Sequence, residues 1–158
     1  MRAEFINPFI TAAREVLKSE IRSEVQLGQL TMEQSAFQNT EVKVMISLTG
    51  ELEGIVFYGL DKDTACNITS AMIGEKVSQF DDMVNSAIGE MGNVICGRAG
   101  GIFEKVGYNT NISTPIVLIG QNAGITTFNL QPILVSLVTD AGTIVLWVSL
   151  RKAILPQE

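Results

Sequence analysis

The chain has 158 residues, of which 46% are hydrophobic and 18% charged, as is typical of one folded domain with a hydrophobic core. Its net charge is −6 and its basic residues form no cluster, which argues against a nucleic-acid partner. It contains no histidine, which excludes a Ser-His-Asp triad, a Cys-His pair and a His-ligated zinc site. We therefore expect a single domain over residues 1–158.

Two further features bear on where the protein acts. The N-terminal stretch MRAEFINPFITAAREVLKSE lacks the apolar core of a signal peptide, and the longest apolar runs are too short to cross a membrane. These observations predict a cytoplasmic protein. Cys66 and Cys96 lie far apart in apolar helical contexts, so we interpret them as buried reduced thiols, although the sequence leaves their pairing open.

The first half of the chain predicts a helix, a polar segment and a β-hairpin. Apolar residues recur at helical spacing over residues 4–22, residues 24–31 favour a short strand, and residues 32–40 favour a loop. Alternating residues over 41–48 and 53–60, separated by a TGEL turn, predict the two strands of the hairpin. A helix is then expected over 62–74, with Asp61 as its N-cap and Gly74 at its end.

The second half begins with a longer helix, from Ser78 or Asp81 to about residue 106, followed by Gly107. Residues 111–120 predict a strand that is weakened at Pro115, which indicates a sheet edge or a bulge there. One or two strands are expected over 125–139, then a TDAG turn and a final strand over 143–150. Trp147 alternates with its neighbours on that strand and is expected in the core.

The two predicted hairpins resemble each other. ISLTGELEGIVFYGL at 46–60 is similar to VSLVTDAGTIVLWVSL at 135–150, and a long helix precedes each. This similarity indicates a repeated helix-plus-hairpin unit. The predicted fold is therefore α+β: one antiparallel sheet with the helices packed on one face.

The helix expected over 80–106 carries two stripes of opposite character. At 100° per residue, one apolar stripe contains Val84, Ile88, Met91, Ile95, Ala99, Ile102 and Val106, and it is expected to lie on the sheet. The opposite stripe contains Ser86, Glu90, Asn93 and Gly97. The polar side chains are therefore expected to point away from the sheet.

Several residues of this helix are poor choices for helical stability. Asn93 has no helix end to cap, and each glycine costs about 1 kcal/mol relative to alanine. The glycines concerned are Gly89, Gly92, Gly97, Gly100 and Gly101. We interpret these small residues as clearance for the backbone of another molecule, because local rules are commonly broken at functional sites.

Glu90 and Asn93 are one helical turn apart, so their side chains reach a common point. A carboxylate and a carboxamide alone make no strong metal cage, so no metal site is expected here. A carboxamide offers both an acceptor and donors and can align a water molecule. This suits hydrolysis of a substrate that is already activated, with Glu90 pairing to a lysine of the partner.

The spacing Ser86-x3-Glu90-x2-Asn93 resembles the D/S-x3-E-x2-N signature of the CheC/CheX/FliY family, whose members are phosphatases of the phosphorylated response regulator CheY. The stretches LTGELEGIVFYGL, ITSAMIG and AIGEMGNVICGRAG occur in the order and at the spacing of CheX-type members. CheC-type members carry the motif twice, whereas the first helix here reads Thr11-x3-Glu15-x2-Lys18 and lacks the asparagine. The single motif is therefore similar to the CheX type.

This resemblance implies an aspartyl-phosphate phosphatase of chemotaxis. Asn93 would orient the attacking water, Glu90 would pair with the regulator's active-site lysine, and Ser86 and Gly97 would flank the contact. The regulator would supply Mg²⁺, so no cofactor of the chain's own is expected. The resemblance also implies a homodimer joined through the sheets. Which response regulator is the substrate stays open.

Two other interpretations remain at this point. The chain could be a binding module of the same fold that docks to a regulator or flagellar component without catalysis. Alternatively, the glycine-rich helix packs tightly within a structural or ligand-sensing domain. In that case Gly97, Gly100 and Gly101 would be buried and the stripe of Ser86, Glu90 and Asn93 would be covered by the protein's own chain.

Overall fold

The computed structural model describes residues 3–120 and 131–154. After a short 3₁₀ turn at Ala3–Phe5, the helices are α1 (Asn7–Ile21), α2 (Ser35–Gln38), α3 (Lys62–Ile73) and α4 (Asp82–Lys105). The strands are β1 (Gln26–Leu27), β2 (Val42–Gly50), β3 (Leu52–Leu60), β4 (Thr110–Ile112), β5 (Ile116–Ile119), β6 (Ile133–Thr139) and β7 (Gly142–Lys152).

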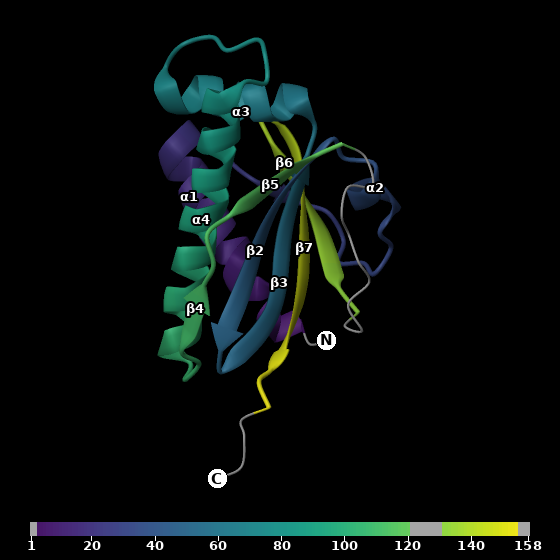
Figure 1. Ribbon diagram of the computed structural model, residues 1–158, viewed down its shortest axis with the longest axis vertical. Coiled ribbons are helices and arrows are strands. Elements are labelled where there is room, and N and C mark those ends of the chain that lie inside the picture. Colours follow the sequence, from purple (N-terminus) through teal and green to yellow (C-terminus); the bar gives the residue numbers. More distant parts are fainter. Residues whose placement is uncertain (1–2, 121–130, 155–158) are drawn as a thin grey trace.

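All seven strands belong to one antiparallel sheet in the order β1-β6-β7-β3-β2-β4, with β5 also paired to β2. The predicted hairpins are β2–β3 and β6–β7, and they meet where β3 pairs with β7. Helix α1 precedes the first hairpin and α4 the second (Figure 1). The expected α+β fold, built from two related helix-plus-hairpin units, is confirmed.

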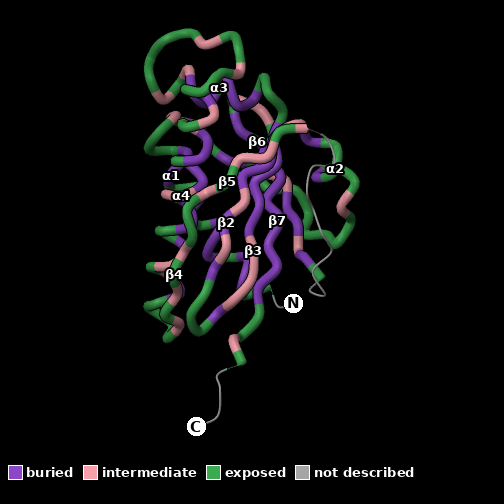
Figure 2. The backbone as a smooth tube through the Cα atoms, viewed as in Figure 1, coloured by how far each residue is buried: buried purple, intermediate pink, exposed green. Residues whose placement is uncertain are grey.

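Helices α1, α3 and α4 cover one face of the sheet (Figure 1). The main core lies between these layers, and the central strands β2, β3 and β7 are largely buried, whereas the edge strands β1, β4 and β5 are not (Figure 2). Alternate residues of the strands point into it, such as Val44 and Ile46 of β2 and Leu146 and Val148 of β7. The inward-facing side chains of the strands, which recur at every second residue, thus pack against the apolar stripes of the helices.

A second, smaller cluster covers part of the opposite face. It contains Phe37, Phe57, Leu134, Val145 and Trp147. Trp147 is buried as predicted, with its ring centroid 5.0 Å from that of Phe57. The prediction of a loop over 32–40 is wrong in part, because Ser35–Gln38 form the single-turn helix α2, which buries Phe37 on this face. One turn is too short to produce a helical periodicity in the sequence.

The ends of the long helices follow the expected signals, with one exception. The Asp81 carboxylate accepts a hydrogen bond from the Val84 backbone N–H at 3.0 Å and caps α4. Gly74 ends α3 with a φ of 74°, which favours glycine. Asp61 occupies the N-cap position of α3 without a side-chain capping bond, and Glu41 accepts from the Lys62 N–H instead, at 3.1 Å.

Residues 113–115 interrupt the sheet edge between β4 and β5, as Pro115 predicts. Ser113 still bonds to β2: its N–H donates to the Ser47 carbonyl and its hydroxyl accepts from the Ser47 N–H, each at 2.9 Å. The break is therefore held in place against the sheet. Of the strands expected over 125–139, residues 133–139 form β6, and 125–130 lie outside the described residues.

Candidate functional site

Helix α4 packs on the sheet through most of the predicted apolar stripe. Its buried residues include Val84, Ile88, Met91, Ile95 and Ala99. The prediction fails in the last turn, where Ile102 is half-buried and Val106 is 67% exposed. Phe103 is buried instead, because this end of α4 packs on α1, with the Phe103 and Phe9 ring centroids 5.6 Å apart.

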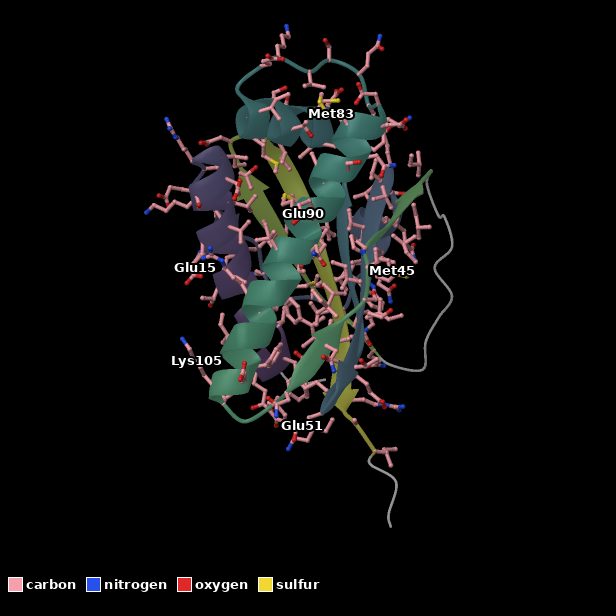
Figure 3. All side chains as sticks on the ribbon, turned by 60° about the vertical axis from the view of Figure 1, so that its left-hand side comes forward. Glu15, Met45, Glu51, Met83, Glu90 and Lys105 are labelled. Atoms are coloured by element: carbon pink, nitrogen blue, oxygen red, sulfur yellow. The ribbon has the colours of Figure 1, made fainter. Side chains whose placement is uncertain are left out.

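A groove of about 580 Å³ runs between α4 and the interrupted edge formed by β4 and β5. The helix lines it with Asn85, Ser86, Gly89, Glu90 and Asn93, and the edge lines it with Ile112, Ser113, Thr114, Pro115 and Val117. Figure 3 shows Glu90 on the middle of α4. The fold thus brings together Ser86, Glu90 and Asn93, three of the four residues predicted for the site.

Ser86 and Glu90 are exposed and Asn93 is half-buried. Within residues 3–120 and 131–154, the side chains of Glu90 and Asn93 form no hydrogen bond or ion pair with the rest of the protein. The Glu90 carboxylate and the Asn93 carboxamide therefore line the groove with their bonding capacity available. The interpretation in which the chain itself covers this stripe does not hold.

Gly97 lies on the same side of α4 but lines a neighbouring hollow of about 630 Å³. This hollow is also lined by Gly100, Gly101 and Glu104 and by the segment Asn109–Ile112, and Ile112 borders both spaces. The structure therefore places Gly97 beside the groove rather than within it.

The glycines of α4 serve two different purposes. A Cβ atom at Gly97 or Gly101 would have no heavy atom within 4 Å. At these two positions no side chain projects from the outer surface of α4. Gly89, Gly92 and Gly100 face the protein's own chain, and a Cβ at Gly92 would lie 3.1 Å from Val44 and 3.2 Å from Tyr58. The expectation that all five glycines clear space for a partner is wrong for Gly92, which lets α4 approach its own sheet, whereas Gly89 lines the groove and Gly100 the neighbouring hollow.

The corresponding positions of α1 are engaged within the chain. Glu15 forms an ion pair of 3.2 Å with Arg98 of α4, and Lys18 forms one of 3.5 Å with Glu24. Figure 3 shows Glu15 on α1, the helix beside α4. The first helix therefore lacks both the asparagine and a free carboxylate at the place where the motif would lie.

The cysteines fit the interpretation of buried reduced thiols, because both are free and buried. The Cys96 sulfur lies 3.1 Å from the hydroxyl of Tyr58, and burial raises the pKa of this thiol to about 12. It is therefore protonated at neutral pH and unsuited to nucleophilic chemistry.

Among the described side chains, no group of three His, Cys, Asp or Glu residues is arranged to hold a metal. No helix within those same residues is long and apolar enough to span a bilayer.

Two parts of the groove were not singled out from the sequence. Asn85 lines its end beside Ser86, and Ser113–Pro115 form the wall opposite the motif. The only signal for that wall was Pro115, which predicts an interrupted strand but not what lies across from it. Asn85 gives no signal beyond being a polar residue inside a helix.

Comparison with known proteins agrees with this arrangement. The family model described as chemotaxis phosphatase CheX matches residues 42–137. The matched range contains the motif of α4 and the whole opposite wall of the groove.

A similar curated protein is the CheY-P phosphatase CheX of Thermotoga maritima, at 29% identity over 81% of this chain and 83% of that protein. A CheC-like superfamily protein from Shewanella sp. PV-4 has a similar structure, with a TM-score of 0.86 and 26% identity over 96% of this chain and 99% of that one. A chain of the CheX–CheY–BeF₃–Mg²⁺ complex from Borrelia burgdorferi has a TM-score of 0.82 and 26% identity, over 96% and 100% of the two chains. The matched sequence range and the shared fold together place this chain in the chemotaxis phosphatase CheX family.

Proposed function

We propose that this chain is a phosphatase that hydrolyses the aspartyl phosphate of a CheY-type response regulator in bacterial chemotaxis. The observation that carries the proposal is the pair of Glu90 and Asn93, which lie one turn apart on the open groove without partners among the described residues. Membership of the CheX family and the activity named for the Thermotoga relative support it.

The substrate chemistry explains why an amide is sufficient. In the hydrolysis, the oxygen of water forms a bond to phosphorus while the bond from phosphorus to the aspartate oxygen breaks. The products are the free aspartate carboxylate and inorganic phosphate, and the proton of the water leaves with the phosphate or passes to solvent. Because the acyl phosphate is already activated, the protein must mainly place the water in line. We assign this role to the Asn93 carboxamide.

Glu90 has a different role in this proposal. Its carboxylate is exposed at the groove, where it can form a charge-assisted hydrogen bond with the active-site lysine of the regulator. Ser86 and Gly97 flank the contact on the same side of α4. The chain contributes no cofactor of its own, and Mg²⁺ comes with the regulator, in line with the Mg²⁺ named in the Borrelia complex.

The proposal includes an organisation for the protein. Residues 1–158 form a single phosphatase domain that acts in the cytoplasm, as a homodimer joined through its sheets. The half-exposed Ile116 and Ile119 of β5 support an apolar contact at the sheet. Light scattering of the purified protein measures the mass directly: a value near 17.1 kDa would rule out the dimer.

A phosphate-decay assay tests the catalytic role. The regulator is phosphorylated with ³²P, and its first-order decay is followed alone, with the wild-type chain, and with Asn93→Ala or Glu90→Ala. We expect Asn93→Ala to lose about 100-fold of the acceleration while its affinity for the regulator stays within a few-fold, because a positioned group is removed. Glu90→Ala is expected to weaken binding as well, because it removes an ionic contact.

The control is Glu15→Ala, which removes the corresponding carboxylate of α1 and should leave the decay unchanged. Full activity of Asn93→Ala would overturn the water-positioning role. Binding of the phosphorylated regulator without any faster decay by the wild-type chain would instead favour the non-catalytic binding module. A panel of phosphorylated regulators then identifies the substrate by the largest acceleration.

A further inference from the structure

The underside of α4, directly behind the motif, packs closely against two residues of the sheet, Val44 and Tyr58. Gly92 lies between Glu90 and Asn93 in sequence and is buried against β2 and β3. A Cβ at this position would lie 3.1 Å from Val44 Cγ1 and 3.2 Å and 3.3 Å from the ring of Tyr58. Helix α4 therefore sits closer to the sheet than an alanine at residue 92 would allow without movement of these neighbours.

Tyr58 also contacts the next turn of the same helix. Its side chain is fully buried, and its hydroxyl lies 3.1 Å from the Cys96 sulfur. Residues 92 and 96 are one turn apart, so the ring meets α4 at one turn and the hydroxyl meets it at the next. Burial raises the pKa of both Tyr58 and Cys96, so the pair stays neutral and places no charge beneath the helix at physiological pH.

The orientation of these contacts links them to the groove. At 100° per residue, Glu90 points about 160° away from Gly92 and Asn93 about 100° away. A movement of α4 away from the sheet at Gly92 would push Glu90 outward. A rotation of the helix would move Asn93 toward or away from the wall formed by Ser113–Pro115, of which Ser113 is hydrogen-bonded to β2.

We propose that Tyr58 is a positioning residue of the phosphatase site. Through its contacts with Gly92 and Cys96 it sets the height and rotation of α4, and so the reach of Asn93 into the groove. This inference rests on the proposed function, because the position of Asn93 matters for rate only if Asn93 aligns the water. Tyr58 itself touches neither the groove nor the regulator, since it is fully buried beneath the helix.

The inference predicts a separation of rate from affinity. A misplacement of about 1 Å at a reacting group can cost as much as 100-fold in rate, whereas binding is spread over a whole surface. We therefore expect Tyr58→Phe to lower the maximal decay rate by about 3- to 10-fold and Gly92→Ala by about 10-fold or more. The dissociation constant for the phosphorylated regulator is expected to stay within about two-fold for both variants.

The experiment combines this assay with a measurement that does not depend on activity. The decay rate at saturating protein and the dissociation constant are measured for the wild type, Tyr58→Phe and Gly92→Ala. Nitrogen-15 NMR of the free proteins reports the side-chain amide of Asn93. The matched control is Tyr108→Phe, which removes the hydroxyl of the chain's other tyrosine, packed against Phe5 and Phe103 away from the motif.

The expected result is a lower maximal rate, an unchanged dissociation constant and a shifted Asn93 amide for Tyr58→Phe and Gly92→Ala, but not for Tyr108→Phe. Rates within two-fold of the wild type with an unmoved Asn93 amide would overturn the inference. A rate loss that merely follows a fall in thermal stability, or that Tyr108→Phe shares, would also overturn it. If the wild type does not accelerate decay at all, the proposed function fails, and the Asn93 amide alone decides whether Tyr58 positions the helix.

Discussion

Helices α1 and α4 occupy corresponding places in the two hairpin units, but they present different surfaces. On α1, the buried residues include Ala12, Ala13 and Leu17, and Glu15 is held in an ion pair with Arg98. On α4, Gly92 lies at the close approach to the sheet, where α1 has Leu17 at the corresponding position, and Glu90 has no such partner within the described residues. The same type of element therefore supports the fold in one unit and carries the candidate site in the other.

This difference shows that the acid–amide pair needs its surroundings. The groove requires a wall opposite the helix, and that wall exists because the sheet edge is broken at Ser113–Pro115. It also requires a carboxylate without an ionic partner in its own chain. Glu15 does not meet this requirement, because it is paired with Arg98. The candidate site is thus formed by one helix together with one sheet edge, and the repeated helix-plus-hairpin unit alone does not create it.

The largest expected effect comes from moving the pair to the other helix. In an Asn93→Ala background, Lys18→Asn combined with Arg98→Ala would recreate a free acid–amide pair on α1. We expect the roughly 100-fold loss of phosphatase activity to remain, because the transplanted pair lacks the wall at Ser113–Pro115. The ³²P decay assay measures this, and recovery of even a tenth of the wild-type rate would show that the pair alone suffices.

A second effect is a dependence of stability on pH that arises on the underside of α4, where Cys96 is buried. Because the Cys96 pKa rises from its usual 9.0 to about 12 on folding, its stabilising contribution is complete below about pH 9 and is lost as the pH rises toward 12. The free energy of unfolding should therefore fall by about 2 kcal/mol between pH 8 and pH 10.5. Tyr58, whose pKa is raised well above 10, changes stability in the same direction at higher pH.

Urea unfolding at the two pH values measures this loss. Cys96→Ser cannot titrate in this range and should remove most of it. Cys66, whose pKa burial also raises, contributes equally in both proteins and serves as the common background. An identical pH dependence in the wild type and Cys96→Ser would show that the thiol is not what titrates.

A third effect concerns the outer surface of α4 at Gly97, where no side chain projects. Gly97→Leu should weaken binding of the phosphorylated regulator by about 10-fold, because a bulky side chain would stand beside the motif where a partner must approach. The fold should not suffer, since a Cβ there meets nothing within 4 Å and leucine favours a helix over glycine. Titration of the labelled regulator gives the affinity, and an unchanged value would remove Gly97 from the contact surface.

The smallest effect is expected at the ion pair between the two helices. The Arg98 and Glu15 side chains are about half exposed, so Arg98→Ala should change the free energy of unfolding by no more than about 0.5 kcal/mol. Phosphatase activity should stay within two-fold of the wild type. Thermal unfolding and the decay assay measure both values, and a loss above about 1 kcal/mol would mean that the pair helps to hold α1 and α4 together.

Much of this fold follows from local patterns in the sequence. The hairpin strands are rich in Val and Ile, and Asp81 and Gly74 mark helix ends, so these elements lie where they are predicted. The motif stripe on α4 also follows from helical spacing, because Ser86, Glu90 and Asn93 share one side of any regular helix.

The features missed from the sequence depend on tertiary contacts. The role of Gly92 is set by Tyr58 and Val44, which are distant in sequence, so the glycine alone could not show which side it faces. The end of the apolar stripe shifts to Phe103 because α1 packs there. The groove itself needs two elements that are adjacent only in space, and no spacing within α4 predicts its second wall.

The pairing of β3 with β7 has a consequence for how the chain folds. Each hairpin can form from residues that are close in sequence, but β3 and β7 are separated by α3, α4 and three strands. Joining them closes a long loop, which slows folding of the central sheet. On the ribosome, β3 must wait with one edge unpaired until β7, close to the C-terminus, has been synthesised. Folding yield should therefore respond most to substitutions on the two facing edges of these central strands.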